Sequence, residues 1–559
     1  MTDVKIQATG NEVVARDWNS IDWCINAKIV RDLRQRIFRA ARQGNRRKVR
    51  SLQRLMLKCT ANQEMSIRKV TQINAGRSTP GIDRITVKTP AARTALMEEL
   101  STYEPWKAQP VRRVFIPKAN GKQRPLGIPT IRDRCMQAIV KNALEPEWEA
   151  QFEPCSYGFR PGRSCHDAIE RLFSIYRPNK NKKWVVDADI SGAFDHIQHE
   201  TILNAIKGFP GQRLIKAWLK AGIIEEKAKV QPEEGTPQGG VISPLLANIA
   251  LHGMEQAIGV IYAKAKTLTG KRALVRYADD FVICTETKED AEQALLEITE
   301  WLLKRGLQLS AEKTHIRHIS EGFDFLGFTV KQYPMQHTRT GWKLLITPSK
   351  KSELAIKHRL KQEWQKVTGY NADAVIGRLN PIIRGWANYF RGSVAKATFG
   401  ELDRFMWDRT LRWCRRTHPH KNHGWITKQY FGKHRKGSQD KWIFGRPESH
   451  LIKFMWTSIT RHKMVPFDMA PDNPDLKEYW EKREKDKSKN LPRRVHALAK
   501  RQGYKCPQCH MSLCNGEELD NHHHVEKTKG GTDKSKNRRL VHLYCHQQIH
   551  SNRKAKQTA

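Results

Sequence analysis

The sequence predicts an α+β fold in which a β-sheet is covered by helices on one face. Two observations predict it. Strand-like and helix-like segments interleave irregularly over most of the first 330 residues, and apolar segments on both sides of Asp279 and Asp280 predict two strands joined by a tight turn. A basic helical region and a small cysteine- and histidine-rich lobe follow. The 559 residues hold several domains, since one core rarely grows beyond about 250–300 residues.

Composition predicts a polyanionic partner. Lys and Arg number 100 against 57 Asp and Glu, which gives a formal charge of +43. No apolar run approaches the roughly 18 residues that a membrane span needs, and residues 1–10 have no apolar core. We therefore expect neither membrane association nor a signal peptide. Eleven cysteines without a secretory signal favour a reducing cytoplasm.

Local patterns predict the elements in order. The segment 28–75 has helical periodicity and many basic residues, and the turn-rich segment 78–83 follows it as a break. Residues 111–117 alternate like a strand and lead into a basic hairpin loop at 118–125, before a helix over 131–144. The later predictions are a strand at 184–190, a turn at 191–195, a Gly/Pro segment at 235–244 that opens a helix at 245–251, a helix at 291–305, basic Trp-rich helices from 350 to about 480, and a charged linker at 481–494.

The adjacent pair Asp279 and Asp280 predicts chemistry. Neighbouring residues on a regular strand point to opposite faces, so a turn is needed to bring both acids to one edge. Like charges held this close need a cation, and carboxylate oxygens suit Mg²⁺. Two-metal phosphoryl transfer requires a second carboxylate-bearing element, which the strand end at Asp189 supplies. For the dipeptide alone, a solvated turn is the alternative.

Other residues fit the same chemistry. Phe194 lies five residues after Asp189 and can wall a sugar pocket, where an aromatic ring selects against a ribose 2′-hydroxyl. Lys118 and Arg124, on the basic hairpin, are candidates for contact with an incoming triphosphate. A surface charge or a core aromatic is the alternative for each residue taken singly.

Seven segments in order resemble the reverse-transcriptase blocks of group II intron-encoded proteins. The resemblance spans about residues 78 to 330, and the segment 78–83 looks like the extra N-terminal block that these proteins share with non-LTR retroelement enzymes. The seven segments are 124–129, 157–164, 189–195, 236–244, 277–280, 309–314 and 323–328.

The resemblance implies a right-hand-like fold with fingers and palm, and it implies roles for matching residues. We expect Asp189 and Asp279 to be the stronger metal ligands and Asp280 the weaker one. The implied roles are Mg²⁺ binding and catalysis by Asp189, Asp279 and Asp280 with Ile190 as a further ligand, a sugar gate at Phe194, contact with the nascent pair by Gln238 and Gly239, triphosphate contact by Lys313, and a primer grip at Phe325, Leu326 and Gly327.

The basic middle region combines aromatic and cationic residues at 379–391 and 411–416. Aromatic rings can stack on bases while Arg and Lys neutralise phosphates. For Trp386 and Tyr389 themselves, packing in the core is the favoured interpretation. The region resembles the maturase or thumb domain of intron proteins, which implies contact with intron RNA and the template–primer duplex.

Two ligand patterns overlap near the C-terminus. Cys506, Cys509, His542 and Cys545 form two pairs with two-residue spacers, which predicts a tetrahedral structural Zn²⁺ that stabilises a lobe too small to rely on its core. Cys514 is the alternative to His542.

The second pattern resembles the ββα-metal (HNH) nuclease. His546 and His550 are four residues apart and share a helix face, so with His523 they can hold a catalytic divalent ion. His524 would activate a water as general base, and Asn537 would orient His524. The extra His522 leaves the register ambiguous, and a zinc ribbon that binds without cutting is the alternative.

The resemblance as a whole implies a bacterial, cytoplasmic group II intron-encoded protein that joins RNA-directed DNA polymerase, maturase and HNH endonuclease in intron retrohoming by target-primed reverse transcription. Its expected partners are group II intron RNA, double-stranded target DNA and deoxynucleoside triphosphates.

Alternatives are another bacterial reverse transcriptase (retron, diversity-generating or CRISPR-associated) and an RNA-binding splicing factor with an inactive polymerase. The expected domains are a basic helical extension (1–77), fingers and palm (78–335), thumb/maturase (336–440), a DNA-binding segment with linker (441–495) and the HNH lobe (496–559).

Overall fold

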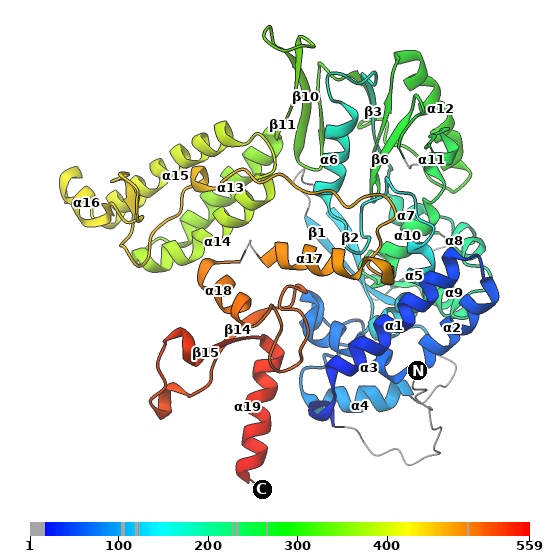
Figure 1. Ribbon diagram of the computed structural model, residues 1–559, viewed down its shortest axis with the longest axis horizontal. Coiled ribbons are helices and arrows are strands. Elements are labelled where there is room, and N and C mark those ends of the chain that lie inside the picture. The colour runs from blue at the N-terminus through cyan, green and yellow to red at the C-terminus, as the bar shows by residue number, and fades with distance from the viewer. Residues whose placement is uncertain are drawn as a thin grey trace.

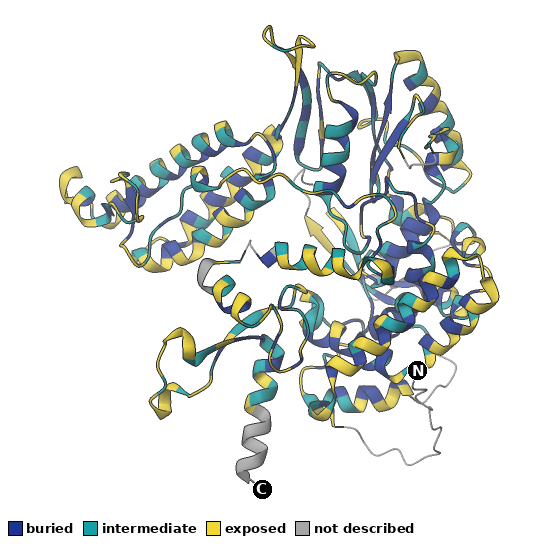
Figure 2. Ribbon diagram, in the orientation of Figure 1, coloured by how far each residue is buried: buried dark blue, intermediate teal, exposed yellow. Residues whose placement is uncertain are grey.

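The computed structural model describes residues 17–101, 107–117, 121, 123–225, 228–230, 234–236, 238–263, 267–488 and 491–558 (Figure 1). Lys118 and Pro237 lie outside these residues. Within the described part of the chain, every helix is too short or too polar to cross a membrane. Buried residues concentrate in the N-terminal helices and the central sheet (Figure 2).

Helices form the N-terminal part, as the periodicity predicted. They are α1 (Trp23–Arg42), α2 (Arg46–Lys58), α3 (Thr60–Arg68), a π-helical turn (Lys69–Ile73) and α4 (Pro90–Ser101). The first helix begins at Trp23 because the Asp22 carboxylate accepts hydrogen bonds from the backbone N–H groups of Cys24 and Ile25. Its buried face, which includes Val30, Leu33 and Ile37, packs against α5 (Ile131–Glu149).

The first sheet is mixed, with strand order β2-β1-β4-β5. Its strands are β1 (Val111–Pro117), β2 (Gln123–Ile128), β4 (Ile223–Glu225) and β5 (Ala228–Val230). The predicted strand at 111–117 is confirmed, and it pairs antiparallel with β2 from Arg112↔Ile128 to Pro117↔Gln123. Its parallel pairing with β4 joins segments that are more than 100 residues apart in the sequence.

The central sheet is antiparallel throughout, with strand order β6-β7-β3-β8. Its strands are β3 (Trp184–Asp189), β6 (Ala273–Tyr277), β7 (Asp280–Thr285) and β8 (His315–His318). The predicted Asp-Asp hairpin is the β6–β7 connection. The part of the chain from β3 to β6 also forms the short helices α7 (Ala193–His196), α8 (His199–Ala205), α9 (Gln212–Lys220), α10 (Ser243–Ala250) and α11 (Met254–Ala257).

Helices cover both faces of the central sheet, and the expectation of one covered face was wrong. Helix α12 (Lys288–Leu303) packs on β7 and β3, whereas α6 (Cys165–Ile175) packs on β6 (Figure 1). Alternate strand residues fall in two different cores: Val186 and Ile283 belong to one, Val185 and Val282 to the other. A sheet buried on both faces has nearly continuous apolar strands, as in 281–284, instead of a polar–apolar alternation.

A third sheet leads into the basic helices. Strands β9 (Phe323–Phe325), β10 (Phe328–Pro334) and β11 (Trp342–Pro348) are antiparallel. Helices α13 (Lys350–Lys366), α14 (Ala372–Phe390), α15 (Lys396–Thr417) and α16 (His423–Tyr430) follow. Trp386 and Tyr389 are partly buried and pack against the apolar core of this region, which confirms the interpretation of both as packing residues.

The helical prediction fails after Tyr430. The next elements are the two-residue strands β12 (Phe431–Gly432) and β13 (Ile443–Phe444), and then an extended strap, residues 457–476, that contains Pro466, Pro471 and Pro474. The predicted linker at 481–494 is largely helical instead, because α17 (Lys477–Lys487) occupies its first half. The strap holds this charged helix: Trp480 Nε1 donates to the Ala470 carbonyl and Arg483 Nη1 to that of Lys463.

The strap crosses the body of the molecule from the basic helices to the N-terminal helices (Figure 1). His462 Nε2 and the Val465 N–H both donate to Asp167 Oδ1, at 3.0 and 2.6 Å. Further along, Arg34 of α1 binds Asp472 through two hydrogen bonds of 2.8 and 2.7 Å. These contacts fix the strap at both ends.

The C-terminal lobe consists of α18 (Arg493–Arg501), the hairpin β14 (Leu519–His523) and β15 (Arg538–His542), and α19 (Leu543–Thr558). It docks on the N-terminal helices. The Arg68–Glu517 ion pair at this interface measures 3.1 Å, and both side chains are at least 95% buried. The Arg68 guanidinium also lies 4.8 Å from the centre of the Trp23 ring.

Candidate functional site

Three carboxylates meet at one edge of the central sheet. Asp189 ends β3 directly opposite Asp280, the first residue of β7, and Asp279 lies in the turn before it. Ala278 has a φ of +61°, so the turn takes the left-handed conformation. The chain approaches this turn closely at Gly158, where an added Cβ would lie 2.3 Å from the Ala278 nitrogen. The structure thus brings together the three acids that the sequence singled out.

Each of these carboxylates makes the ionisation of its neighbours less favourable. Removal from water raises the pKa of Asp279, and the Asp189 carboxylate adds to the rise. Removal from water, the Asp279 charge and a hydrogen bond with Asp189 raise the pKa of Asp280 to about 7. Because Asp280 is exposed to solvent, repulsion between the carboxylates contributes more to its raised pKa than burial does. Such a group fits a bound divalent cation, which removes the repulsion.

Basic side chains face the acids. Lys313 Nζ lies 2.5 Å from Asp189 Oδ2, and this hydrogen bond raises the pKa of Lys313. The positive charges of Arg124, on β2, and of Lys313 both oppose the rise in the pKa of Asp279. Two of the predicted triphosphate contacts therefore lie within electrostatic reach of the acids. The third, Lys118, is outside the described residues.

Phe194 and the 238–239 turn each contact another part of the chain. The Phe194 ring, on α7, packs edge-to-face on Phe159 with 6.2 Å between ring centres. The Gly127 N–H of β2 donates to the Gln238 carbonyl at 2.7 Å. Gly239 has a φ of +122°, and an added Cβ would lie 2.6 Å from the Gly127 oxygen, so only glycine fits there.

The segment Phe325–Gly327 forms a tight turn between β9 and β10. Leu326 and Gly327 both have positive φ, +51° and +84°, as a two-residue type I′ hairpin requires. Tyr389 Oη of α14 donates to the Leu326 carbonyl at 2.9 Å, and the Ser349 N–H donates to that of Gly327 at 2.9 Å. The basic helices therefore hold the backbone of this turn.

The C-terminal lobe contains the predicted four-ligand group. One ligand atom from each of Cys506, Cys509, His542 and Cys545 lies within 4.8 Å of all the others, and all four residues are buried. His542 Nε2 donates to the Ser512 carbonyl at 3.1 Å, which leaves Nδ1 facing Cys509 Sγ at 3.3 Å. Hydrogen bonds with Cys509 and Cys545 lower the pKa of the Cys506 thiol. The set fits tetrahedral Zn²⁺, and Cys514 lies outside it.

The second group contains His522 and not His523, so the expected register was wrong by one residue. His522, His546 and His550 place ligand atoms within 4.8 Å of one another. On β14 successive side chains alternate, and His523 turns to the other face, where it binds Asp533 at 2.8 Å. His546 Nδ1 binds Asp520 Oδ2 at 2.8 Å, and its Nε2 lies 3.0 Å from His550 Nε2. Two ring nitrogens at this distance fit a shared cation.

Asn537 organises the loop that carries His524. The His524 N–H donates to the Asn537 carbonyl at 2.9 Å, so the expected backbone contact is present. The Asn537 side chain accepts from the Val525 N–H and donates to the carbonyls of Val525 and Thr532. The sequence reasoning missed Asp520, the partner of His546. Its spacing of two from His522 was the available signal, because residues i and i+2 share a strand face.

The comparisons divide the chain into three matched segments. Residues 116–330 match the family described as reverse transcriptase (RNA-dependent DNA polymerase). Residues 18–100 match the N-terminal domain of reverse transcriptase, and residues 354–431 match the group II intron maturase-specific domain. The three acids and Lys313 lie in the first segment, and α14 and α15 lie in the third.

Two curated relatives are each similar to less than half of the chain. Protein YkfC of Escherichia coli is 36% identical over 298 residues, which cover 46% of this chain and 77% of YkfC. The group II intron-encoded protein LtrA of Lactococcus lactis is 35% identical over 291 residues. The chain belongs to the family of group II intron-encoded proteins. The match spans 41% of this chain and 48% of LtrA, so about half of LtrA has no matched counterpart here.

This family membership establishes a reverse transcriptase fold of mixed α/β content joined to a group II intron maturase domain. A solved structure of apo telomerase from Candida tropicalis is also similar, with a TM-score of 0.32 and 15% identity over 41% of this chain and 54% of that one. The C-terminal lobe lies beyond the three matched segments of this intron-encoded protein.

Proposed function

We propose that this chain is an RNA-directed DNA polymerase and maturase that acts on group II intron RNA. The observation that carries the proposal is the group of Asp189, Asp279 and Asp280, held by a strand end and a hairpin turn with Lys313 beside them. In this proposal the central sheet is the palm, the first sheet belongs to the fingers, and the basic helices α13–α16 form the thumb.

Asp189, Asp279 and Asp280 would hold Mg²⁺ through their carboxylates. Ile190 would contribute its backbone carbonyl, because its side chain is apolar and buried. When bound, Mg²⁺ lowers the pKa of a primer 3′-hydroxyl and neutralises the leaving pyrophosphate. Lys313 and Arg124 would bind the triphosphate. Phe194 would exclude a 2′-hydroxyl, and the Phe325–Gly327 turn would hold the primer terminus. The Gln238–Gly239 backbone would lie against the new base pair.

Primer extension on an RNA template with Mg²⁺ and deoxynucleotides tests the polymerase. We expect Asp279→Asn to lower the extension rate by about 10³-fold or more, because several kcal/mol of charge stabilisation is lost. Glu292→Gln, which changes an exposed acid on α12 outside the assigned sites, is the control and should extend like the wild type. Comparable extension by the Asp279→Asn variant would show that these acids are not the polymerase site. Intron-RNA binding should persist in both variants.

We further propose that the C-terminal lobe is a zinc-stabilised HNH endonuclease that nicks DNA. The convergence of His522, His546 and His550 supports the proposal, together with the hold of Asn537 on the His524 backbone. His524 would act as general base on a water molecule, and the histidine group would hold a divalent ion that polarises the phosphodiester. The four Cys/His ligands would hold a separate structural Zn²⁺.

Conversion of supercoiled plasmid to open circles in Mg²⁺ or Mn²⁺ tests the nuclease. His546→Ala and His524→Ala should each lose nicking yet keep primer extension. His510→Ala, an exposed histidine of the same lobe outside both ligand groups, should retain both activities. Nicking by His546→Ala at the wild-type rate would contradict the assignment and favour a zinc-binding lobe that does not cut.

Together these activities support retrohoming by target-primed reverse transcription in a bacterial cytoplasm, with intron RNA, target DNA and deoxynucleotides as partners. A polymerase of another bacterial class would not depend on an intron RNA. A splicing factor with an inactive polymerase would bind intron RNA without extending primers. The extension assay separates the splicing factor from the proposal, and the measurement of intron-RNA binding separates a polymerase of another bacterial class.

A further inference from the structure

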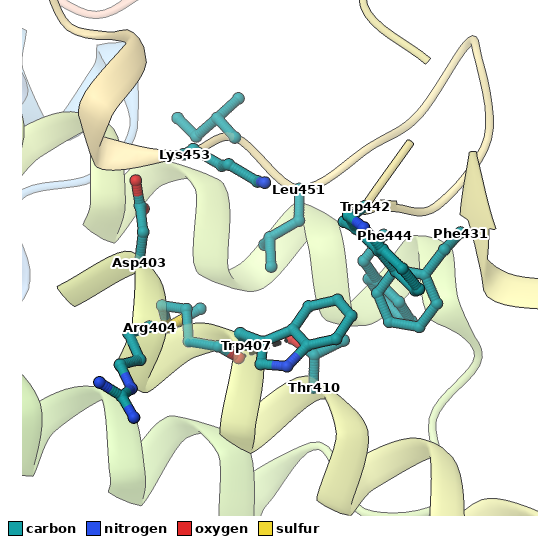
Figure 3. A pocket seen from close by; sticks show the side chains of 11 residues that line it. Asp403, Arg404, Trp407, Thr410, Phe431, Trp442, Phe444, Leu451 and Lys453 are labelled. Carbon is teal, nitrogen blue, oxygen red and sulfur yellow. Dashed lines mark hydrogen bonds between the residues drawn. The ribbon is translucent and has the colours of Figure 1, made fainter. Parts of the chain in front are cut away.

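A cavity of about 390 Å³ opens between α15 and the β12–β13 region (Figure 3). Its walls come from two segments separated in the sequence, 403–410 and 431–453. The volume falls within the roughly 300–1,000 Å³ typical of ligand pockets. Neither the acid group nor the C-terminal ligand groups contribute to its lining.

Aromatic rings line one end of the cavity. Trp407 lies 5.2 Å from Trp442 and 5.1 Å from Phe431 between ring centres, and Phe444 completes this end (Figure 3). Trp407 and Trp442 meet nearly at right angles, with 83° between the ring planes. Trp442 is 38% exposed, whereas Phe431 and Phe444 are buried. Trp442 therefore offers part of its ring to solvent at this end of the cavity.

Charged groups line the other end. Arg404 and Lys453 stand there with Asp403 (Figure 3). The Asp403 carboxylate is already bound, since it accepts from the N–H groups of Phe454 and Met455 at 2.7 and 3.0 Å. The two segments that form its walls, 403–410 and 431–453, carry eight Lys and Arg residues against four Asp and Glu residues.

We propose that this cavity binds an unstacked base of single-stranded RNA. A planar base would stack on Trp442 or Trp407, and Arg404 and Lys453 would meet the flanking phosphates. The basic surroundings favour a polyanion over an apolar peptide or a lipid tail. RNA is favoured over DNA because α15 lies inside the group II intron maturase-specific match. This inference rests on the proposed binding of RNA, and it adds a site that holds one base unstacked from its neighbours in the strand.

Binding of two fluorescently labelled 12-nucleotide RNA probes to the full chain tests the proposal. One probe is single-stranded oligo(U), and the other is a mixed-sequence duplex of the same length. We expect Trp442→Ala to weaken single-strand binding by about 5- to 10-fold, as for loss of one stacking contact, and duplex binding by less than about 2-fold. Trp442→Phe keeps a stacking face and should retain most of the affinity.

Trp425→Ala is the matched control, because Trp425 is 37% exposed on α16 and has Lys421 over its ring, but does not line the cavity. It should bind both probes like the wild type. Photo-crosslinking of 5-iodouridine RNA should join the probe to the peptides that contain Trp407 or Trp442. A wild-type chain that binds neither probe would refute the proposed RNA function itself.

Normal RNA binding by a folded Trp442→Ala variant would refute the base pocket alone. So would equal losses on single strand and duplex, which would indicate a general loss of the basic surface. A larger loss on single-stranded DNA of the same length than on RNA would overturn the choice of RNA. A melting temperature within a few degrees of the wild type shows that Trp442→Ala has folded.

Discussion

At the scale of single residues, Lys313 explains how three carboxylates are tolerated at one sheet edge. Its ammonium group binds Asp189 and is 63% exposed, so the long side chain can leave the acid when another cation arrives. An arginine would bind the carboxylate in a fixed fork and would release it less easily. Lysine therefore suits a position where a protein cation and a metal ion exchange.

Glu255 is a buried acid outside the candidate sites. It lies on α11, is 6% exposed, and accepts a hydrogen bond from Tyr262 Oη. Burial is the main cause that raises the pKa of Glu255 to about 7, and the nearby Glu153 charge adds to the rise. The unfolded chain ionises Glu255 near pH 4.5, whereas the folded chain keeps it neutral up to about pH 7.

This difference predicts a pH-dependent effect of Glu255→Gln. Above pH 4.5 the acid lowers the stability of the folded chain, and the loss grows until about pH 7. The neutral glutamine escapes this penalty, so the variant should gain stability relative to the wild type as the pH rises from 5 to 8. The gain should be on the order of 1–3 kcal/mol. Thermal unfolding midpoints across this pH range measure it.

The control for this prediction is Glu292→Gln, on the exposed face of α12, where the glutamate side chain is 54% exposed. Its midpoint difference from the wild type should stay nearly constant with pH. A difference for Glu255→Gln that is flat, or that shrinks toward pH 8, would mean that Glu255 is ionised in the folded chain.

At the scale of elements, short runs of β-prone residues bounded by turn residues were reliable guides. The strand at 111–117, the strand that ends at Asp189 and the Asp-Asp hairpin all appear where the sequence predicted them. Each combines β-branched or aromatic residues with a polar or glycine-containing boundary, so local preference and tertiary structure agree. Burial of both faces of the central sheet was not predicted, since it depends on tertiary contacts such as those of α6 with β6 and of α12 with β3, whose partners lie far apart in the sequence.

Three sequence-based predictions were wrong, each for its own physical reason. Residues 431–476 are basic and Trp-rich like the helices before them, but the prolines and the β12–β13 pairing override that similarity. Helix α17 has no strong apolar face, so its stability comes from Trp480 and Arg483 bound to the strap. At β14, three consecutive histidines left two registers open, and only the position of α19 decides which face meets His546.

At the scale of the whole molecule, the N-terminal helices and the C-terminal lobe meet at Arg68. Its guanidinium joins Glu517 of the C-terminal lobe to Trp23 of α1. A second contact runs from Gln548 Nε2 to the Asn19 carbonyl at 2.6 Å. The proposed nuclease lobe is therefore fixed against the N-terminal part of the reverse transcriptase and not tethered loosely beyond it.

This interface predicts a selective effect of Glu517→Gln. Removal of one charge leaves Arg68 buried without its ion partner, which typically costs about 3–5 kcal/mol. Part of that loss should appear as weaker docking of the lobe. We expect faster hydrogen exchange in α3 and in residues 491–558. The proposed zinc content should not change, since none of the four Cys/His residues of the candidate site is altered.

The neighbouring Glu518→Gln is the matched control. Glu518 is 62% exposed and lies 3.7 Å from Arg77, so its loss should alter stability by less than about 1 kcal/mol. If the two variants exchange hydrogen at the same rate, the buried pair does not hold the lobe. A loss of zinc in Glu517→Gln would instead indicate that the lobe itself has unfolded.

The strap limits the order in which contacts can form while the protein is synthesised on the ribosome. Arg34 is made early, yet its partner Asp472 follows 438 residues later. At about 5–20 residues per second, this interval lasts roughly 20–90 s. Glu145 of α5, which lies 2.8 Å from Arg34 in the folded protein, is synthesised much earlier than Asp472. The contact of Arg34 with both carboxylates can therefore form only after the strap has been synthesised and has reached the N-terminal helices.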